Sequence, residues 1–176
     1  GMNSLAIHQR TSGTEFDLGG NDGVATLGLA DAELSRITAG NLFIGNANSG
    51  DITISDLILL PYQANMILTT GDHAIRFVGG SLNANGGRLP NGGDITLVTG
   101  GSGNVTANSS GGTTDITAVT LSITTGAVSG RGIGSPSNPL RTQAVSLNTN
   151  TSIGNGDQFL VEHDDEGDSL TIGSAG

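Results

Sequence analysis

Three short stretches of the sequence share one pattern: Gly50–Ser55 reads GDITIS, Gly93–Val98 reads GDITLV, and Thr114–Val119 reads TDITAV. In each, an aspartate is followed by alternating apolar and small polar residues, which is typical of a half-buried β-strand. The isoleucines that follow the aspartates lie 43 and 21 positions apart. We therefore expect a period of about 21 residues, with a fourth copy near position 73.

The apolar run Ile75–Val78 supplies this fourth copy. Aligning the aspartates would add Asp72 to the series, but it would place His73 where the other copies have an inward isoleucine. Burying an unpaired imidazole costs free energy. We therefore align the isoleucines, with a two-residue insertion in one turn, and expect one inward column formed by Ile52, Ile75, Ile95 and Ile116.

A period of about 20–23 residues with two or three short strands per period predicts an all-β fold, a parallel β-helix (β-solenoid). Helical periodicity is confined to Ala30–Ile37, whereas short alternating runs closed by glycine or asparagine recur along the chain. The threonines after the repeated isoleucines should then form an outward column, which consists of Thr53, Thr96 and Thr117.

The composition fits such thin, regular layers. Glycine, serine, threonine and asparagine make up nearly half of the 176 residues, which taken alone would indicate a disordered linker. However, isoleucine, leucine and valine are frequent enough along the whole chain to build a core. Aromatic residues are scarce, with four phenylalanines, one tyrosine and no tryptophan, as a narrow aliphatic interior would require.

The charged residues exclude several classes of partner. The chain has 16 acidic residues, six arginines and no lysine, and its net charge is −10. A nucleic-acid-binding protein needs a basic surface, so we expect no nucleic-acid partner. The longest apolar run, Leu57–Leu60, is far too short for a membrane span, so we expect no membrane insertion. Cysteine is absent, which excludes disulfides and thiolate chemistry.

Two stretches resemble a known family. They are Glu33–Ser55, ELSRITAGNLFIGNANSGDITIS, and Gly132–Asp164, GIGSPSNPLRTQAVSLNTNTSIGNGDQFLVEHD. Both are similar to segments of the filamentous haemagglutinin-like family of large, repetitive, secreted bacterial surface proteins, and the ELSRIT and SPSNPL phrases carry most of the similarity. The resemblance implies a right-handed parallel β-helix, displayed outside the cell, that acts as an adhesin or its stalk. It implies no catalytic residues and no cofactor.

We therefore expect three segments: residues 1–32 as an N-terminal cap or first turns, 33–156 as β-helix turns, and 157–176 as an acidic hairpin or last turn. The expected function is that of a structural and adhesive module, secreted or at the cell surface in association with the outer membrane. Its partners would be host or cell-surface glycans or proteins. Open ends of the stack would also allow end-to-end self-association.

The C-terminal acidic cluster has two interpretations. Six of the 16 acidic residues fall between Asp157 and Asp168, a density of oxygen ligands that could bind Ca²⁺, with Asp164, Asp165 and Asp168 as the candidate ligands. Alternatively, the segment is a β-hairpin with strands 159–161 and 170–172 and a polar tip at 164–167. The turn-forming residues at the tip favour the hairpin.

Asp51, Asp94 and Asp115 allow a second function to be considered. Paired carboxylates serve as acid and base in carbohydrate-active β-helix enzymes. However, an aspartate at a corner before a strand more often accepts backbone N–H bonds, and we favour that role and no enzymatic activity. A third function, ice binding, would require paired threonine columns, and here the second column reads Ser55, Val98 and Val119.

Overall fold

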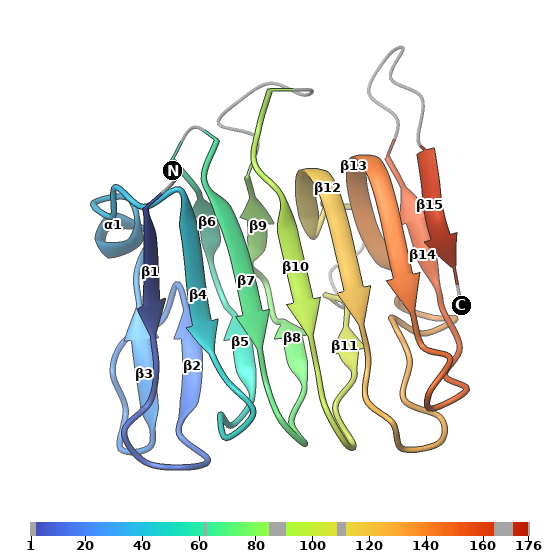
Figure 1. Ribbon diagram of the computed structural model, residues 1–176, viewed down its shortest axis with the longest axis horizontal. Coiled ribbons are helices and arrows are strands. Elements are labelled where there is room, and N and C mark those ends of the chain that lie inside the picture. The colour runs from blue at the N-terminus through green and yellow to red at the C-terminus, as the bar shows by residue number, and fades with distance from the viewer. Residues whose placement is uncertain (1–2, 62, 85–90, 109–111, 164–170, 176) are drawn as a thin grey trace.

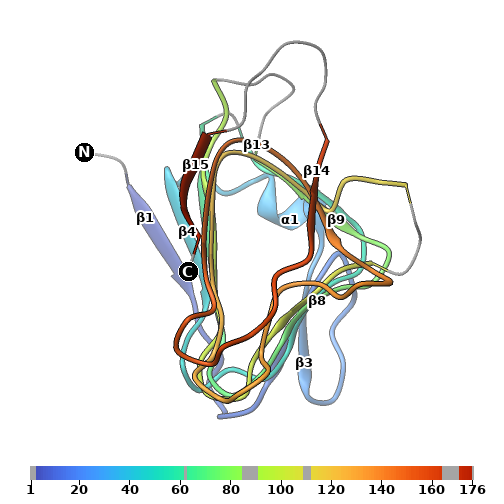
Figure 2. The ribbon, with the colours of Figure 1, turned by 90° about the vertical axis from the view of Figure 1, so that its right-hand side faces the viewer.

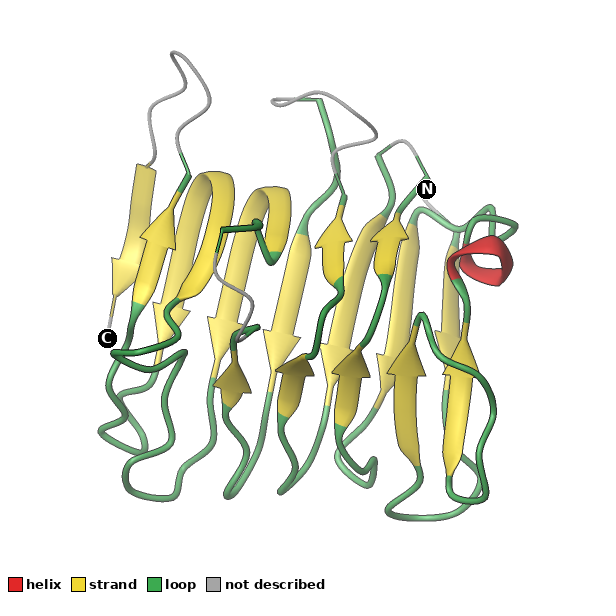
Figure 3. Ribbon diagram, turned by 180° about the vertical axis from the view of Figure 1, so that it is seen from behind, coloured by secondary structure: helices red, strands yellow, loops and turns green. Residues whose placement is uncertain are grey.

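The computed structural model describes residues 3–61, 63–84, 91–108, 112–163 and 171–175. They form a predominantly β structure whose paired strands are all parallel, arranged in two sheets (Figures 1 and 3). The helix α1 (Asp31–Leu34) is a single turn, and no helix in the described part of the chain is long and apolar enough to span a membrane. The β-rich, parallel character predicted from the sequence is confirmed.

Sheet A has ten strands and sheet B has five. The strands of sheet A are β1 (Ser4–Ile7), β4 (Asn41–Gly45), β6 (Leu57–Leu59), β7 (Asn65–Thr69), β9 (Ser81–Asn83), β10 (Ile95–Val98), β12 (Ile116–Thr124), β13 (Leu140–Asn150), β14 (Leu160–Glu162) and β15 (Thr171–Ala175). Those of sheet B are β2 (Glu15–Leu18), β3 (Thr26–Leu29), β5 (Ile52–Ile54), β8 (Ile75–Phe77) and β11 (Val105–Thr106).

Sheet A is curled because its two longest strands bend across the molecule. The first part of β12 pairs with β9, through Ile116 and Leu82, and its last part pairs with β10, through Leu121 and Ile95. Figure 2 shows the resulting arch, with β4 and β15 on one side and β9 and β14 on the other. Sheet B completes the second side below β9.

The interior between the two sides is filled by aliphatic side chains. Along β10, Ile95 and Leu97 are fully buried while Thr96 and Val98 are half-buried, which is the alternation expected of a strand with one face on the core. Most of the fully buried side chains are isoleucine and leucine, and Phe16 and Phe77 are the buried aromatic residues among those described. The scarcity of large rings therefore reflects a narrow core.

The prediction of a right-handed parallel β-helix with about 20–23 residues per turn is wrong. Successive partners along sheet A are unevenly spaced in the sequence: Leu5 pairs with Leu42, Leu42 with Met66, Met66 with Ile95, Ile95 with Leu121, and Leu121 with Leu147. In sheet B, Phe16 pairs with the nearby Leu27 on one side and with the distant Ile52 on the other. The connections thus have no common length, and the strands form a curled sheet and a separate second sheet in place of uniform turns.

The predicted isoleucine column is correct for one pair only. Ile52 and Ile75 are partners in sheet B. Ile95 lies in sheet A beside Met66 and Leu121, and Ile116 lies in another part of sheet A. The outward threonine column fails for the same reason, because Thr53 and Thr96 lie in different sheets and Thr117 is buried. The motif therefore indicates the start of a strand whose first residue faces the core, but its copies lie at different positions in the two sheets.

The hairpin predicted at the C-terminus is also wrong. β14 pairs with the first part of β13, through Leu160 and Leu140, and β15 pairs with its last part, through Ile172 and Leu147. Both pairings are parallel, so the segment continues sheet A beyond β13. The predicted tip, residues 164–167, lies outside the described residues. At the other end, β1 and β3 are the outer strands of the two sheets, within the segment expected to act as a cap.

Candidate functional site

The aspartates of the three repeated motifs bind backbone N–H groups. Asp51 Oδ1 accepts a hydrogen bond from Ala74 N at 2.8 Å, and Asp94 Oδ1 accepts one from Thr120 N at 3.0 Å. Asp115 Oδ2 accepts one from Arg141 N at 2.9 Å. Each aspartate therefore accepts a backbone N–H bond, as predicted, but the donor lies in or beside a neighbouring strand and not in the aspartate's own turn, so the predicted capping of that turn is not what these bonds do. Since Ile52 and Ile95 lie in different sheets, these carboxylates form no single ladder for acid–base catalysis.

Other acidic side chains have the same role. Their carboxylates accept backbone N–H bonds of 2.6–3.0 Å, and sequence reasoning did not predict these bonds because several of the partners lie in distant strands or loops. The pairs are Asp22 with Gly28, Asp31 with Leu59, Glu33 with Ala30, Asp56 with Leu57, and Glu162 with Ala144. Much of the negative charge of the chain is therefore used to hold backbone segments in place.

Asp51 is the centre of the ion pairs in the described part of the chain. Its Oδ2 lies 2.8 Å from Arg76 Nε, and its Oδ1 lies 3.6 Å from His73 Nδ1. Partial burial raises the pKa of the Asp51 carboxyl, but the hydrogen bonds from Arg76 and Ala74 and the charges of Arg76 and His73 outweigh it. The net result is a pKa below the usual value of 3.8.

This shift predicts how stability depends on pH. Because the pKa is lower in the folded chain, the ionised carboxylate stabilises the fold at neutral pH, and this contribution is lost as the pH falls through the folded-state pKa. Asp51→Asn should therefore lower the free energy of unfolding by about 1 kcal/mol at pH 7 and by less at pH 3, which lies below the usual pKa of 3.8, measured by urea unfolding.

Asp72→Asn is the matched control for that comparison. Asp72 is the next aspartate along the chain, it is exposed, and its carboxylate has no hydrogen bond or ion pair among the described residues. Its free energy of unfolding should equal that of the parent chain at both pH values. A loss for Asp51→Asn that is as large at pH 3 as at pH 7 would show that the carboxylate charge is irrelevant.

Asp115 differs from Asp51 in being 1% exposed. Burial raises the pKa of the Asp115 carboxyl, and the backbone hydrogen bonds from Arg141 and Asn108 and the Arg141 charge lower it only in part. Its Oδ1 has no hydrogen-bond partner among the described residues. Perturbed carboxyls of this kind are often functional, but this one is sealed from solvent.

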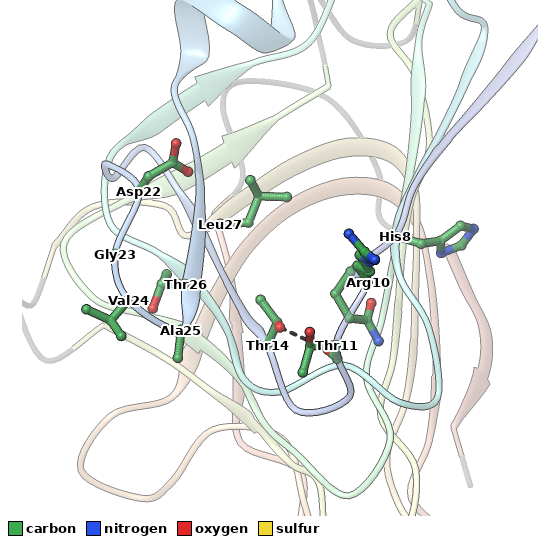
Figure 4. A pocket seen from close by; sticks show the side chains of 11 residues that line it. His8, Arg10, Thr11, Thr14, Asp22, Gly23, Val24, Ala25, Thr26 and Leu27 are labelled. Carbon is green, nitrogen blue, oxygen red and sulfur yellow. Dashed lines mark hydrogen bonds between the residues drawn. The ribbon is translucent and has the colours of Figure 1, made fainter.

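A groove in the described part of the chain lies at the N-terminal end of the molecule. It has a volume of about 460 Å³. One side is formed by residues 8–14, which connect β1 to β2, and the other by residues 22–27, which lead into and begin β3. We name it the N-terminal groove. Figure 4 shows the Arg10 side chain lying between the two sides, with the imidazole of His8 turned away.

Some polar groups of the N-terminal groove already form hydrogen bonds within the chain, whereas the Arg10 guanidinium forms no ion pair with a described residue. Asp22 Oδ1 accepts the hydrogen bond from Gly28 N at 3.0 Å, and Thr14 Oγ1 donates to the Thr11 carbonyl at 2.9 Å. Arg10 is exposed and takes part in neither of the ion pairs formed by the described residues. The groove thus combines a cation, several hydroxyl groups and an apolar patch around Leu27. The sequence alone identified none of these residues as a site.

A second groove, of about 330 Å³, lies at the opposite end between β13, β14 and β15. Its polar side chains are already paired: Thr142 Oγ1 donates to Glu162 Oε2 and Thr149 Oγ1 donates to Gln158 Oε1, both at 2.5 Å. It is therefore less suited than the N-terminal groove to bind a charged ligand.

The calcium candidates Asp164, Asp165 and Asp168 lie outside the described residues, so calcium binding there stays a prediction. Within the described ranges, no group of three or more histidine, aspartate or glutamate side chains is placed to hold a metal ion.

Comparison with known proteins identifies no relative: the chain matches no family model, no curated protein and no solved structure. A function must therefore be inferred from the surfaces and grooves of the molecule itself.

Proposed function

We propose that this chain is a structural and adhesive module of a secreted bacterial surface protein of the filamentous haemagglutinin-like type. In this role it would present a rigid face to glycans or proteins at a cell surface. The observation that carries the proposal is the outward side of sheet A. The parallel strands β4, β7, β10, β12 and β13 lie side by side there along the long axis of the molecule (Figure 1).

We name this surface the outer face and define it by two columns of residues in register. One column is Phe43, Ile67, Thr96, Ser122 and Asn148; the other is Thr69, Val98, Thr124 and Asn150. All are half-buried or exposed, and none is charged. In a chain of net charge −10, two neighbouring columns without carboxylates support contact with a partner, because no charged group within them must be desolvated.

A line of hydrogen bonds braces the edge of the outer face. Asn65 Nδ2 donates to Asn41 Oδ1 at 3.0 Å, and Asp94 N donates to Asn65 Oδ1 at 2.9 Å. Thr120 N donates in turn to Asp94 Oδ1 at 3.0 Å. These bonds join successive strands from β4 to β12, which supports a rigid surface, and a rigid surface loses little conformational entropy on binding.

Thr96→Arg tests this proposal, because it places a long, charged side chain in the middle of the outer face. We expect binding of the labelled protein to cultured epithelial cells and to an array of immobilised glycans to fall at least about tenfold, since the guanidinium must be desolvated or must hold the partner away. Thr53→Arg is the matched control, with the same change at a half-buried outward position in sheet B.

The control should bind like the parent chain, and both variants should keep the parent's unfolding midpoint in urea. Equal binding by the parent and both variants would contradict the assignment to the outer face. A parent chain that binds neither the cells nor any glycan would contradict the adhesive role itself.

A further inference from the structure

We infer that the N-terminal groove binds the carboxylate of a single acidic sugar residue through Arg10. The inference rests on the proposed function in one respect, since it supposes that glycan contact is part of the work of the chain. The residues that carry it are separate from the outer face.

The first argument is the charge of Arg10. The chain has six arginines, no lysine and 16 acidic residues, so cationic side chains are scarce. Among the described arginines only Arg76 forms an ion pair, with Asp51, and Arg10 is distinguished by lining the N-terminal groove, where its guanidinium is free to meet a ligand. A guanidinium presents a planar pair of N–H donors that matches the two oxygens of a carboxylate.

The second argument is the character of the surrounding groove. Thr11, Thr14 and Thr26 bring hydroxyl groups to it, and Val24 and Leu27 bring apolar surface (Figure 4). A sugar ring has the same mixture, with hydroxyl groups around its edge and C–H groups on its faces. The volume of about 460 Å³ lies within the range of small-ligand sites, roughly 300–1,000 Å³.

The third argument limits the ligand to one charge. Asp22 lines the groove, and Glu15 lies beside it, since its Oε2 accepts a 3.5 Å hydrogen bond from Thr26 Oγ1. Together with the net charge of −10, these carboxylates would repel the further charges of a polyanion within a Debye length of about 8 Å. A terminal acidic residue on an otherwise neutral glycan avoids this repulsion.

The test compares two probes that differ only at the charged group, methyl glucuronide and methyl glucoside, by NMR titration of the isotopically labelled chain. The glucuronide should shift the amide signals of residues 8–14 and 22–27, and the glucoside should not. Arg10→Gln should weaken glucuronide binding about tenfold or more, because it removes a charge-assisted hydrogen bond. Arg36→Gln, which removes another exposed guanidinium outside the groove, should bind like the parent chain.

Equal binding of the two probes, or unchanged binding by Arg10→Gln, would overturn the inference. An oligogalacturonide that binds more tightly than the monosaccharide would overturn the limit to one charge. If the glucuronide does not bind the groove but Thr96→Arg abolishes cell binding, the inference about Arg10 is wrong and the proposed function stands. Glucuronide binding in the groove, combined with no effect of Thr96→Arg on cell binding, would support the inference about Arg10 and contradict the assignment of binding to the outer face.

Discussion

Replacing Gly71 with alanine should lower the free energy of unfolding by about 3 kcal/mol, because the new Cβ would meet backbone that cannot move aside. A Cβ at this position would lie 2.0 Å from the carbonyl oxygen of Ala47 and 3.0 Å from its carbonyl carbon. On its other side, the Gly71 carbonyl accepts a hydrogen bond from Gly100 N at 2.7 Å. Gly71 is thus held between two neighbouring loops, and urea unfolding would measure the loss.

This glycine belongs to a column of close backbone contacts below sheet A. A Cβ on Gly126 would lie 2.2 Å from the Gly100 carbonyl oxygen, and one on Gly154 would lie 2.7 Å from that of Gly126. The loops that leave successive strands pack there backbone to backbone, which only glycine permits. This close packing of loop backbones is therefore one specific reason why the sequence is rich in glycine.

Gly23→Ala provides the control for Gly71→Ala. A Cβ on Gly23 would have its nearest neighbour at 3.5 Å, an ordinary van der Waals contact, and the residue has no positive φ. Its free energy of unfolding should change by less than about 0.5 kcal/mol. If the two alanine variants were equally stable, the loops would not pack as closely as described.

The strands could be predicted from the sequence because each is indicated by the alternation of apolar and polar residues within its own few positions. Alternation at Ile95–Leu97 and at Leu42–Ile44 depends only on which residues face the core, and both runs lie in strands. The pairing of Ile95 with Met66 and Leu121 could not be predicted, because it depends on the connections between strands. Those connections vary in length, so a similarity between motifs says nothing about which strands are neighbours.

The candidate site likewise has features that could be predicted from the sequence and features that could not. That Asp51 accepts a backbone N–H bond was predictable, since an aspartate beside a turn commonly does so. The donor, Ala74 N, was not predictable, because it lies 23 residues away in the sequence. The groove around Arg10 was not predictable either, because it forms where residues 8–14 meet residues 22–27, and no spacing in the sequence signals that contact. The one available signal was the scarcity of cations, which makes the surroundings of each arginine worth determining.

The neighbour relations on the outer face underlie both the fold and the proposed function, and engineered disulfides test them directly. The chain has no cysteine, so an introduced pair has no competing thiols. Ile67 and Thr96 are partners in the parallel pairing of β7 with β10. Neighbouring strands lie about 4.8 Å apart, which a disulfide can bridge. The competing arrangement, based on the motif period, would instead make Thr96 and Thr117 neighbours.

The deciding measurement is the fraction of free thiol after mild oxidation of two double variants, Ile67→Cys/Thr96→Cys and Thr96→Cys/Thr117→Cys. We predict nearly complete disulfide formation within the first variant and none within the second, because Thr96 pairs with Ser122, which lies well beyond Thr117 along β12. A disulfide in the second variant and free thiols in the first would contradict the two-sheet arrangement, and with it the outer face.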